Sequence, residues 1–233
     1  MGDQGSADFD VVVLAGGTAR RFGGADKVLL PVAGRPMLER VVSAGAAART
    51  VVVVGPQRPL PPGAPTVRWT REQPAGSGPL AAVAAGLELC GSAIVVVLAG
   101  DMPLLDSFVV RTLVRTVAAS AGAEGPAPVD RSPIDRSPLG RSPAAEPAVD
   151  GVVLVDAEGR RQPLAAAYVR ASLQRAFATI GDPADRPMRL LLDQLHVATV
   201  TDPRAALDCD TPESLARADH LADSPPDAEP PPR

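Results

Sequence analysis

The chain has 233 residues, 45% of them hydrophobic, which is enough apolar material for one sizeable core. Its net charge of −4 argues against a broad nucleic-acid-binding surface, and no apolar run approaches the ~20 residues of a membrane span. Its two cysteines form no CxxC pair, which argues against a zinc site or a disulfide framework. We therefore expect a cytoplasmic protein with no nucleic-acid or membrane partner.

Three apolar runs in the first hundred residues predict strands that are buried on both faces. They are rich in Val and Ile without alternation, as is typical of a parallel sheet covered by helices. These strands are Val11–Ala15, Val51–Val54 and Ile94–Ala99. Helical patterns follow them at Met37–Ala48, Pro79–Leu89 and Ser107–Ala119. This alternation predicts an α/β fold with a doubly wound, mostly parallel sheet.

The pattern changes at residues 120–150, where an imperfect Asp-Arg-Ser-Pro repeat lacks apolar partners. We expect a disordered Ser/Pro-rich insertion, with a phosphorylation or docking segment as the alternative. Beyond it, the turn-forming residues Asp156–Arg160 separate the strand candidates Val152–Val155 and Leu164–Tyr168 and predict a small β-hairpin insertion. The remaining elements are expected at Ala171–Ile180, Met188–Leu195, Val197–Val200 and Pro212–Leu221. We expect one domain over residues 1–223 and a disordered tail at 224–233.

The stretch VVVLAGGTARRFGGADK places a glycine-rich, basic loop directly after the first strand. Ligands of open α/β sheets bind at the carboxyl ends of the strands. Gly16 and Gly17 let backbone N–H groups approach a ligand closely, and Arg20, Arg21 and Lys27 add positive charge. The stretch matches neither the P-loop nor the GxGxxG dinucleotide fingerprint. These features favour a site for the phosphates of a nucleotide.

A second polar group follows the strand Ile94–Ala99, at the same predicted edge of the sheet. Asp101 lies just after Gly100 there, where a carboxylate can hold a Mg²⁺ ion on a polyphosphate. Asp210 precedes Thr211 and Pro212, so the residues alone suggest that it starts the last helix with Thr211 as cap.

Five stretches of the chain together resemble the MobA-like nucleotidyltransferases. They are LAGGTARRFGGADKVLLPVAGRPML, GSGPLAAVAAGLE, LAGDMPLL, EGRRQPLAAAY and LDCDTPESLARA, in that order. The resemblance implies Mg²⁺-dependent transfer of GMP from GTP to the phosphate of molybdenum-bound molybdopterin, with release of pyrophosphate. It also implies partners among the proteins of molybdenum-cofactor biosynthesis or delivery.

The resemblance assigns roles to particular residues of this chain. Arg21, Lys27 and Asp101 are expected to be catalytic, and Asp101 and Asp210 to be the metal ligands. Substrate contacts are expected at Leu14, Ala15, Gly16, Gly17, Lys27, Glu72, Gly78 and Asp101.

Two other functions remain open from the sequence. The first keeps the fold but uses CTP or another NTP with molybdopterin, a sugar phosphate or phospholactate. Aspartate at 210 and the lack of a guanine-reading asparagine after Val51–Val54 keep it open. The second is a non-catalytic nucleotide-binding regulator of cofactor delivery. The pair Lys27 and Asp101 argues against it, because binding alone does not require both.

Overall fold

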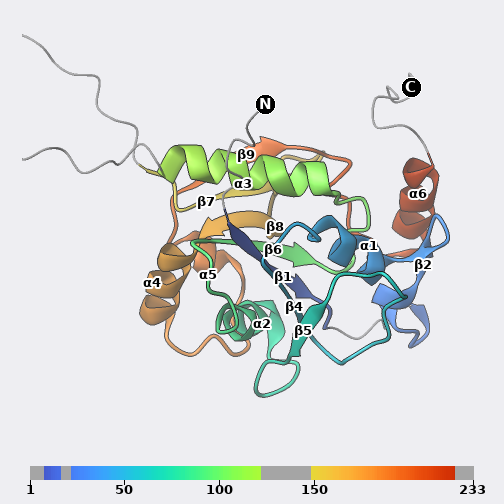
Figure 1. The fold of residues 1–233 in the computed structure, drawn as a ribbon, viewed down its shortest axis with the longest axis horizontal. Coiled ribbons are helices and arrows are strands. Elements are labelled where there is room, and N and C mark those ends of the chain that lie inside the picture. The colour runs from blue at the N-terminus through green and yellow to red at the C-terminus, as the bar shows by residue number, and fades with distance from the viewer. Residues whose placement is uncertain (1–7, 17–21, 122–147, 224–233) are drawn as a thin grey trace, which may run out of the picture.

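A seven-stranded sheet with helices on both faces organises the molecule (Figure 1). The computed structural model describes residues 8–16, 22–121 and 148–223. Most of the expected Ser/Pro-rich insertion (residues 122–147) and the tail lie outside these ranges, as do Gly17 and Arg21. The strands are β1 (Phe9–Leu14), β4 (Thr50–Val54), β5 (Val67–Thr70), β6 (Ile94–Ala99), β7 (Gly151–Val155), β8 (Arg161–Val169) and β9 (Val197–Thr201).

The strand order is β5-β4-β1-β6-β8-β7-β9, and β8 alone runs antiparallel to its neighbours. The mostly parallel α/β sheet expected from the sequence is therefore confirmed. The expected hairpin is also present as β7 and β8, and both of its strands belong to the main sheet.

Helices cover the two faces of the sheet in separate layers. Their bounds are α1 (Met37–Ala44), α2 (Gly78–Leu87), α3 (Ser107–Ala121), α4 (Arg170–Ile180), α5 (Arg189–Leu192) and α6 (Pro212–Ala222). Figure 1 shows α1 and α3 on one side of the sheet and α2, α4 and α5 on the other. Alternate side chains of β1 pack into these two layers, Val11 and Val13 on the α1 and α3 side and Val12 on the α2 side. This explains why the strand has no polar face.

Some elements differ from the sequence-based expectation. Helix α1 ends at Ala44 rather than Ala48, and α5 spans only Arg189–Leu192. Strand β5 and the two-residue strands β2 (Pro31–Val32) and β3 (Arg35–Pro36) were not expected. Helix α6 packs beside β2, where Val32, Met37 and Cys209 are fully buried in a small core of their own. The C-terminal helix is thereby fixed beside the first part of the chain.

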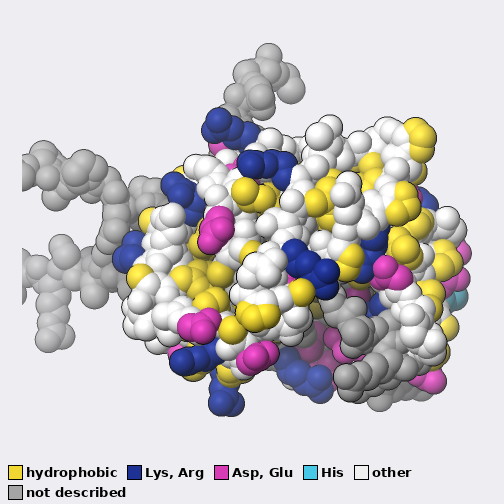
Figure 2. Space-filling model, turned by 90° about the horizontal axis from the view of Figure 1, so that it is seen from below, with side chains coloured by type: hydrophobic (Ala, Val, Ile, Leu, Met, Phe, Trp, Pro, Cys, Tyr) yellow, Lys and Arg dark blue, Asp and Glu magenta, His cyan; other side chains and the backbone are white. Residues whose placement is uncertain are grey.

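Charged side chains of both signs share the face of the molecule shown in Figure 2. On the face shown in Figure 2, basic side chains are scattered among acidic and apolar ones and form no continuous patch. No helix among the described residues is both long enough and apolar enough to cross a bilayer. A cluster of paired charges lies at the carboxyl ends of the parallel strands.

Candidate active site

The carboxyl ends of three strands meet at one edge of the sheet. In the parallel register, Leu14 of β1 lies beside Val54 of β4 on one side and Ala99 of β6 on the other. The strand ends approach so closely that a Cβ atom on Gly100 would lie 2.8 Å from the carbonyl oxygen of Leu14. The loops that follow β1, β4 and β6 therefore leave the sheet side by side, as expected for the ligand-binding edge of an open α/β sheet.

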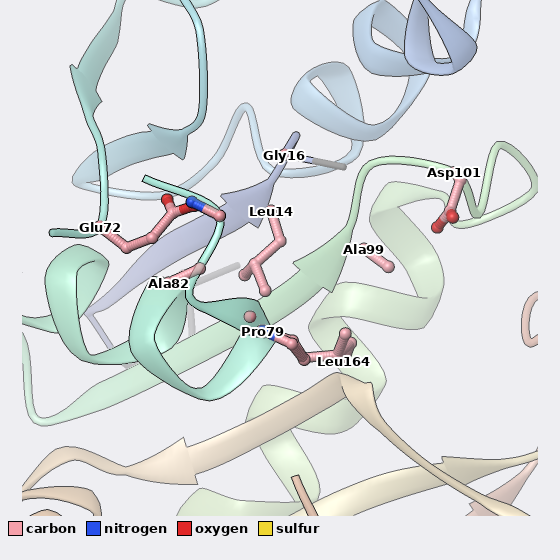
Figure 3. Close-up of a pocket in the computed structure, with 10 residues that line it drawn as sticks. Leu14, Gly16, Glu72, Pro79, Ala82, Ala99, Asp101 and Leu164 are labelled. Atoms are coloured by element: carbon pink, nitrogen blue, oxygen red, sulfur yellow. The ribbon is translucent and has the colours of Figure 1, made fainter. Parts of the chain in front are cut away.

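A cavity of about 220 Å³ opens at this edge. Its floor is apolar, and Glu72 and Asp101 lie at its opposite ends (Figure 3). The lining residues are Leu14, Gly16, Glu72, Gly76, Gly78, Pro79, Ala82, Ala99, Asp101 and Leu164. Five of the expected substrate-binding residues thus line one cavity: Leu14, Gly16, Glu72, Gly78 and Asp101. Ala15, which was also expected to bind substrate, is fully buried behind it.

Lys27 brings together two carboxylates that are distant in sequence. Its Nζ atom lies 2.6 Å from Oδ2 of Asp101 and also donates a hydrogen bond to Oδ1 of Asp210. Lys27 begins the 3-10 helix η2 (Lys27–Leu29), and the next residue, Val28, is buried in the core. The amine therefore reaches the end of β6 from a backbone that packing holds in place.

These contacts keep the amine charged. Burial alone lowers the pKa of Lys27, but the charge and hydrogen bond of Asp101, joined by those of Asp210, outweigh it. The net result is a pKa above the ordinary value of 10.5. Lys27 is also the only lysine of the chain, because the other 22 basic residues are arginines. The cation at this position is thus a compact ammonium in a chain that otherwise uses guanidinium.

The structure shows which residue caps α6 and where the side chain of Asp210 lies. Thr211 caps α6, since its hydroxyl accepts from the N–H of Ser214 at 3.2 Å and its own N–H donates to Oγ of Ser214 at 3.0 Å. The side chain of Asp210 is therefore not needed at the helix start and points to Lys27 instead. Cys209 supports this placement, because its N–H donates to the carbonyl of Asp101 at 3.0 Å.

The local charge balance is acidic. The pKa of Asp208 is raised, first by burial and then by the negative charges of Asp210 and Asp101. No group of three or more His, Cys, Asp or Glu side chains among the described residues forms a closed metal site. Two carboxylates that share one cation suit Mg²⁺, which binds through one or two carboxylates together with phosphate oxygens and water. The donor set of Asp101 and Asp210 fits that ion.

Glu72 lines the cavity and has a buried carboxylate oxygen without a hydrogen-bond partner among the described residues. Glu72 is 7% exposed, and its Oε1 atom accepts a hydrogen bond from the N–H of Gly76 at 2.8 Å. The other oxygen, Oε2, has no hydrogen-bond partner among the described residues. A buried carboxylate oxygen without a donor is costly, so it marks a place where a ligand donor is expected. Gly76 and Gly78 have φ of +86° and +92°, which explains the glycines of this turn.

Sequence reasoning missed one residue of this region. Arg58 lies in the loop after β4, is 9% exposed, and binds Asp26 through two nitrogens. Nothing in the sequence indicated this pairing, because the arginine stands in a Pro-rich stretch, 32 residues from its partner. An arginine in such a stretch is typical of an exposed loop.

Comparison with known proteins agrees with this geometry. The model of the MobA-like NTP transferase domain matches residues 11–200, which is most of the chain. The chain belongs to the MobA-like NTP transferase family. The match begins within β1, includes the loop after it, Lys27 and Asp101, and ends before Asp210.

Relatives of known name do not all carry the same name. The chain is 34% identical over 114 residues to a molybdenum cofactor guanylyltransferase of Cupriavidus metallidurans, a match that covers 47% of this chain. It is 42% identical over 132 residues to the bifunctional protein GlmU of Rhodospirillum rubrum, which covers 51% of this chain. The chain spans 55% and 27% of the lengths of these two relatives.

Solved structures share the fold over nearly the whole chain. The molybdopterin-guanine dinucleotide biosynthesis protein A of Archaeoglobus fulgidus superposes with a TM-score of 0.62 at 20% identity, covering 91% of this chain and 98% of that one. A 2-C-methyl-D-erythritol 4-phosphate cytidylyltransferase of Thermus thermophilus gives 0.60 at 20% identity, covering 92% and 98%. At this identity the likeness identifies a nucleotidyltransferase fold and does not select the donor.

Proposed function

We propose that this family member transfers GMP from GTP to the phosphate of molybdenum-bound molybdopterin and releases pyrophosphate. The observation that carries nucleotidyl transfer is the meeting of Lys27, Asp101 and Asp210 at the end of the cavity. Transfer to phosphorus depends mainly on positioning and on charge neutralisation, and this cluster supplies a cation and two metal-binding carboxylates. The family membership and the guanylyltransferase relative support the same reaction.

The chain's own residues have separate tasks in this reaction. A Mg²⁺ ion bound by Asp101 and Asp210 would neutralise triphosphate oxygens and orient the α-phosphorus. Lys27 then exchanges one or both carboxylates for phosphate oxygens and balances charge on the departing pyrophosphate. Gly16 presents its backbone to the phosphates, together with the expected contributions of Gly17 and Arg21. The acceptor phosphate attacks in line, and no covalent enzyme intermediate is needed.

Glu72 supports GTP as the donor. Glu72 lies at the end of the cavity opposite Asp101, and its carboxylate accepts one N–H through Oε1 and has no partner at Oε2 among the described residues. Guanine presents two adjacent donors, N1–H and the 2-amino group, which match a carboxylate. Cytosine presents only its amino group as a donor on the corresponding edge. A buried carboxylate therefore discriminates in favour of guanine.

A second candidate keeps the chemistry and changes the substrates. The fold is shared with a cytidylyltransferase, and GlmU is among the relatives, so CTP or another NTP with molybdopterin, a sugar phosphate or phospholactate is the alternative. A non-catalytic regulator of cofactor delivery is the other one. With an NTP as donor, we propose a cytoplasmic location, and with this acceptor, partners among the proteins that make or deliver the molybdenum cofactor.

Pyrophosphate release distinguishes these functions. Purified protein is incubated with Mg²⁺ and GTP, CTP, ATP or UTP in turn, without an acceptor and with molybdenum-bound molybdopterin, a sugar phosphate or phospholactate. We expect release with GTP that requires the acceptor, and a guanine dinucleotide product by mass spectrometry. Release with CTP or only with a sugar phosphate would support the alternative substrates. NTP binding without release under any condition would support the regulator.

A further inference from the structure

Arg58 joins three loops at the ligand-binding edge of the sheet. Its Nε and Nη2 donate to the two carboxylate oxygens of Asp26 at 2.5 and 3.0 Å. Its Nη1 donates to the carbonyl oxygens of Ala15 at 2.8 Å and Pro56 at 3.0 Å. One planar guanidinium thus holds the end of β1, the start of the loop after β4, and the residue before Lys27.

Arg58 is buried, so its contacts with these three groups differ from an ion pair on the exposed surface. The side chain of Arg58 is 7% exposed, whereas that of Asp26 is 37% exposed. A buried charge is strongly unfavourable unless it is paired and hydrogen-bonded, and three acceptor groups meet that need here. The guanidinium has little freedom to leave, so its partners are held to it.

The carboxylate of Asp26 binds Arg58 instead of capping the helix that Asp26 precedes. It stands at the N-cap position of η2, where aspartate side chains commonly accept N–H groups of the first turn. Its carboxylate makes no such cap bond and is bound to Arg58 instead. The backbone of Asp26 still supports the turn, since its carbonyl accepts the N–H of Leu29 at 3.0 Å. The turn that carries Lys27 is therefore attached to the sheet through Arg58.

Lys27 is consequently anchored on both sides along the chain. On one side of Lys27, Asp26 is bound to Arg58. On the other side, Val28 is buried beside Gly100, whose Cβ, if it had one, would lie 3.3 Å from the Cγ1 atom of Val28. Ala15 and Asp26 are both bound to the guanidinium of Arg58, so the residue next to Lys27 is held in place relative to the end of β1.

From this geometry we infer that Arg58 is a positioning residue: through Asp26 it fixes Lys27 where the amine meets Asp101 and the triphosphate. Arg58 does not line the cavity, and its guanidinium is occupied by Asp26, Ala15 and Pro56, so we infer that it acts through Asp26. A displacement of about 1 Å in a charged group can lower turnover by about 100-fold. The inference rests on the proposed function in one respect, because its activity measurement uses nucleotide transfer from GTP.

The test uses the single lysine of the chain. An amine-directed reagent at a fixed pH modifies Lys27 and the N-terminus alone, and mass spectrometry of the Lys27 peptide gives its rate. The variants are Arg58→Met and Asp26→Asn. The matched control is Arg170→Met, which removes a part-buried guanidinium that donates to the carbonyl of Ser92 at 3.0 Å, at the start of β6 and away from the cavity. Circular dichroism verifies that each variant is folded.

We expect Lys27 to be modified severalfold faster in Arg58→Met and Asp26→Asn than in the wild type, and unchanged in Arg170→Met. In parallel, kcat/KM for GTP should fall by about 10- to 100-fold in the first two variants. Arg58→Lys keeps the positive charge but lacks the planar guanidinium with its several donors. It should therefore restore neither the labelling rate of Lys27 nor kcat/KM for GTP fully. If Arg58→Met does not fold, Asp26→Asn, whose side chain is partly exposed, decides the question alone.

Wild-type labelling of Lys27 in folded Arg58→Met or Asp26→Asn would overturn the inference, even if the melting temperature fell. A loss of kcat/KM without faster labelling would overturn it as well, since the effect would not pass through Lys27. Failure of the wild type to transfer any nucleotide would instead reject the proposed function. The labelling comparison still tests the role of Arg58 in that case, so the two failures are distinguishable.

Discussion

The Nζ atom of Lys27 lies 2.6 Å from Oδ2 of Asp101, although 74 residues separate them in the chain. The contact joins the loop after β1 to the loop after β6, whose strands are hydrogen-bonded neighbours in the sheet. Asp210, 183 residues after Lys27, completes the cluster from the start of α6. The cation and the carboxylates needed for a polyphosphate thus converge at one end of one cavity.

The first prediction concerns this pair directly. Lys27→Met and Asp101→Asn each remove charge and nearly preserve side-chain size. We expect each to lower kcat by about 100- to 1,000-fold, the range seen when one preorganised electrostatic group is removed. The measurement is pyrophosphate release with GTP, and Arg170→Met serves as a folded control with wild-type rates. Normal turnover in either site variant would reject its catalytic role.

The second prediction concerns the ionisation of Lys27. Its raised pKa means that the ion pairs stabilise the folded state fully below the unfolded-state value of about 10.4 and are lost as pH rises through the higher folded-state value. Because Lys27 is the only lysine, ¹³Cε-lysine labelling gives a single NMR signal. Its titration midpoint should exceed 10.5 and should fall in Asp101→Asn. A wild-type midpoint at or below 10.5 would contradict the ion-pair arrangement.

The sequence predicted the sheet and its helices well because the central strands are continuous Val/Ile runs. Strand β5 was missed, since Val67–Thr70 has four residues, carries Arg68, and pairs with β4 alone at the edge of the sheet. The two-residue strands β2 and β3 contain prolines and form only a local pair. Short edge pairings give too little periodic signal to be recognised from sequence.

The site was predicted only in part, and the reason is distance along the chain. Motifs identified Lys27 and Asp101, because each directly follows a recognisable strand or loop. The sequence left open whether Asp210 binds metal or only starts α6; the structure gives the cap to Thr211 and places Asp210 beside Lys27, and the metal role stays a prediction. Arg58 carried no local signal, since its role depends on the position of Asp26. The expected roles of Gly17 and Arg21 lie outside the described residues and stay predictions.

A third prediction separates metal binding by Asp210 from simple charge pairing. Its side chain is 54% exposed, so Asp210→Asn should change stability little. If the carboxylate binds Mg²⁺, the Mg²⁺ concentration for half-maximal rate should rise roughly 10- to 100-fold. Rates are measured across a Mg²⁺ titration at saturating GTP. An unchanged Mg²⁺ dependence together with a normal kcat would leave Asp210 without a metal role.

A fourth prediction addresses the choice of nucleotide. Glu72→Gln keeps the size of the side chain but replaces one acceptor oxygen by a donor. Loss of a hydrogen bond to a charged group corresponds to about 10- to 100-fold in kcat/KM for GTP. Activity with CTP should change much less, so the ratio of the two rates is the measurement. An equal loss with both nucleotides would indicate that Glu72 supports the loop through Gly76 rather than reading the base.

The central claim is that Lys27 and Asp101 act on the same polyphosphate. Its most direct test is a crystal structure of the protein with Mg²⁺ and a non-hydrolysable GTP analogue. We expect Nζ of Lys27 within hydrogen-bond distance of a phosphate oxygen, Mg²⁺ bound to Asp101, and guanine beside Glu72. A triphosphate bound elsewhere, with Lys27 still held by Asp101 and Asp210, would contradict the account.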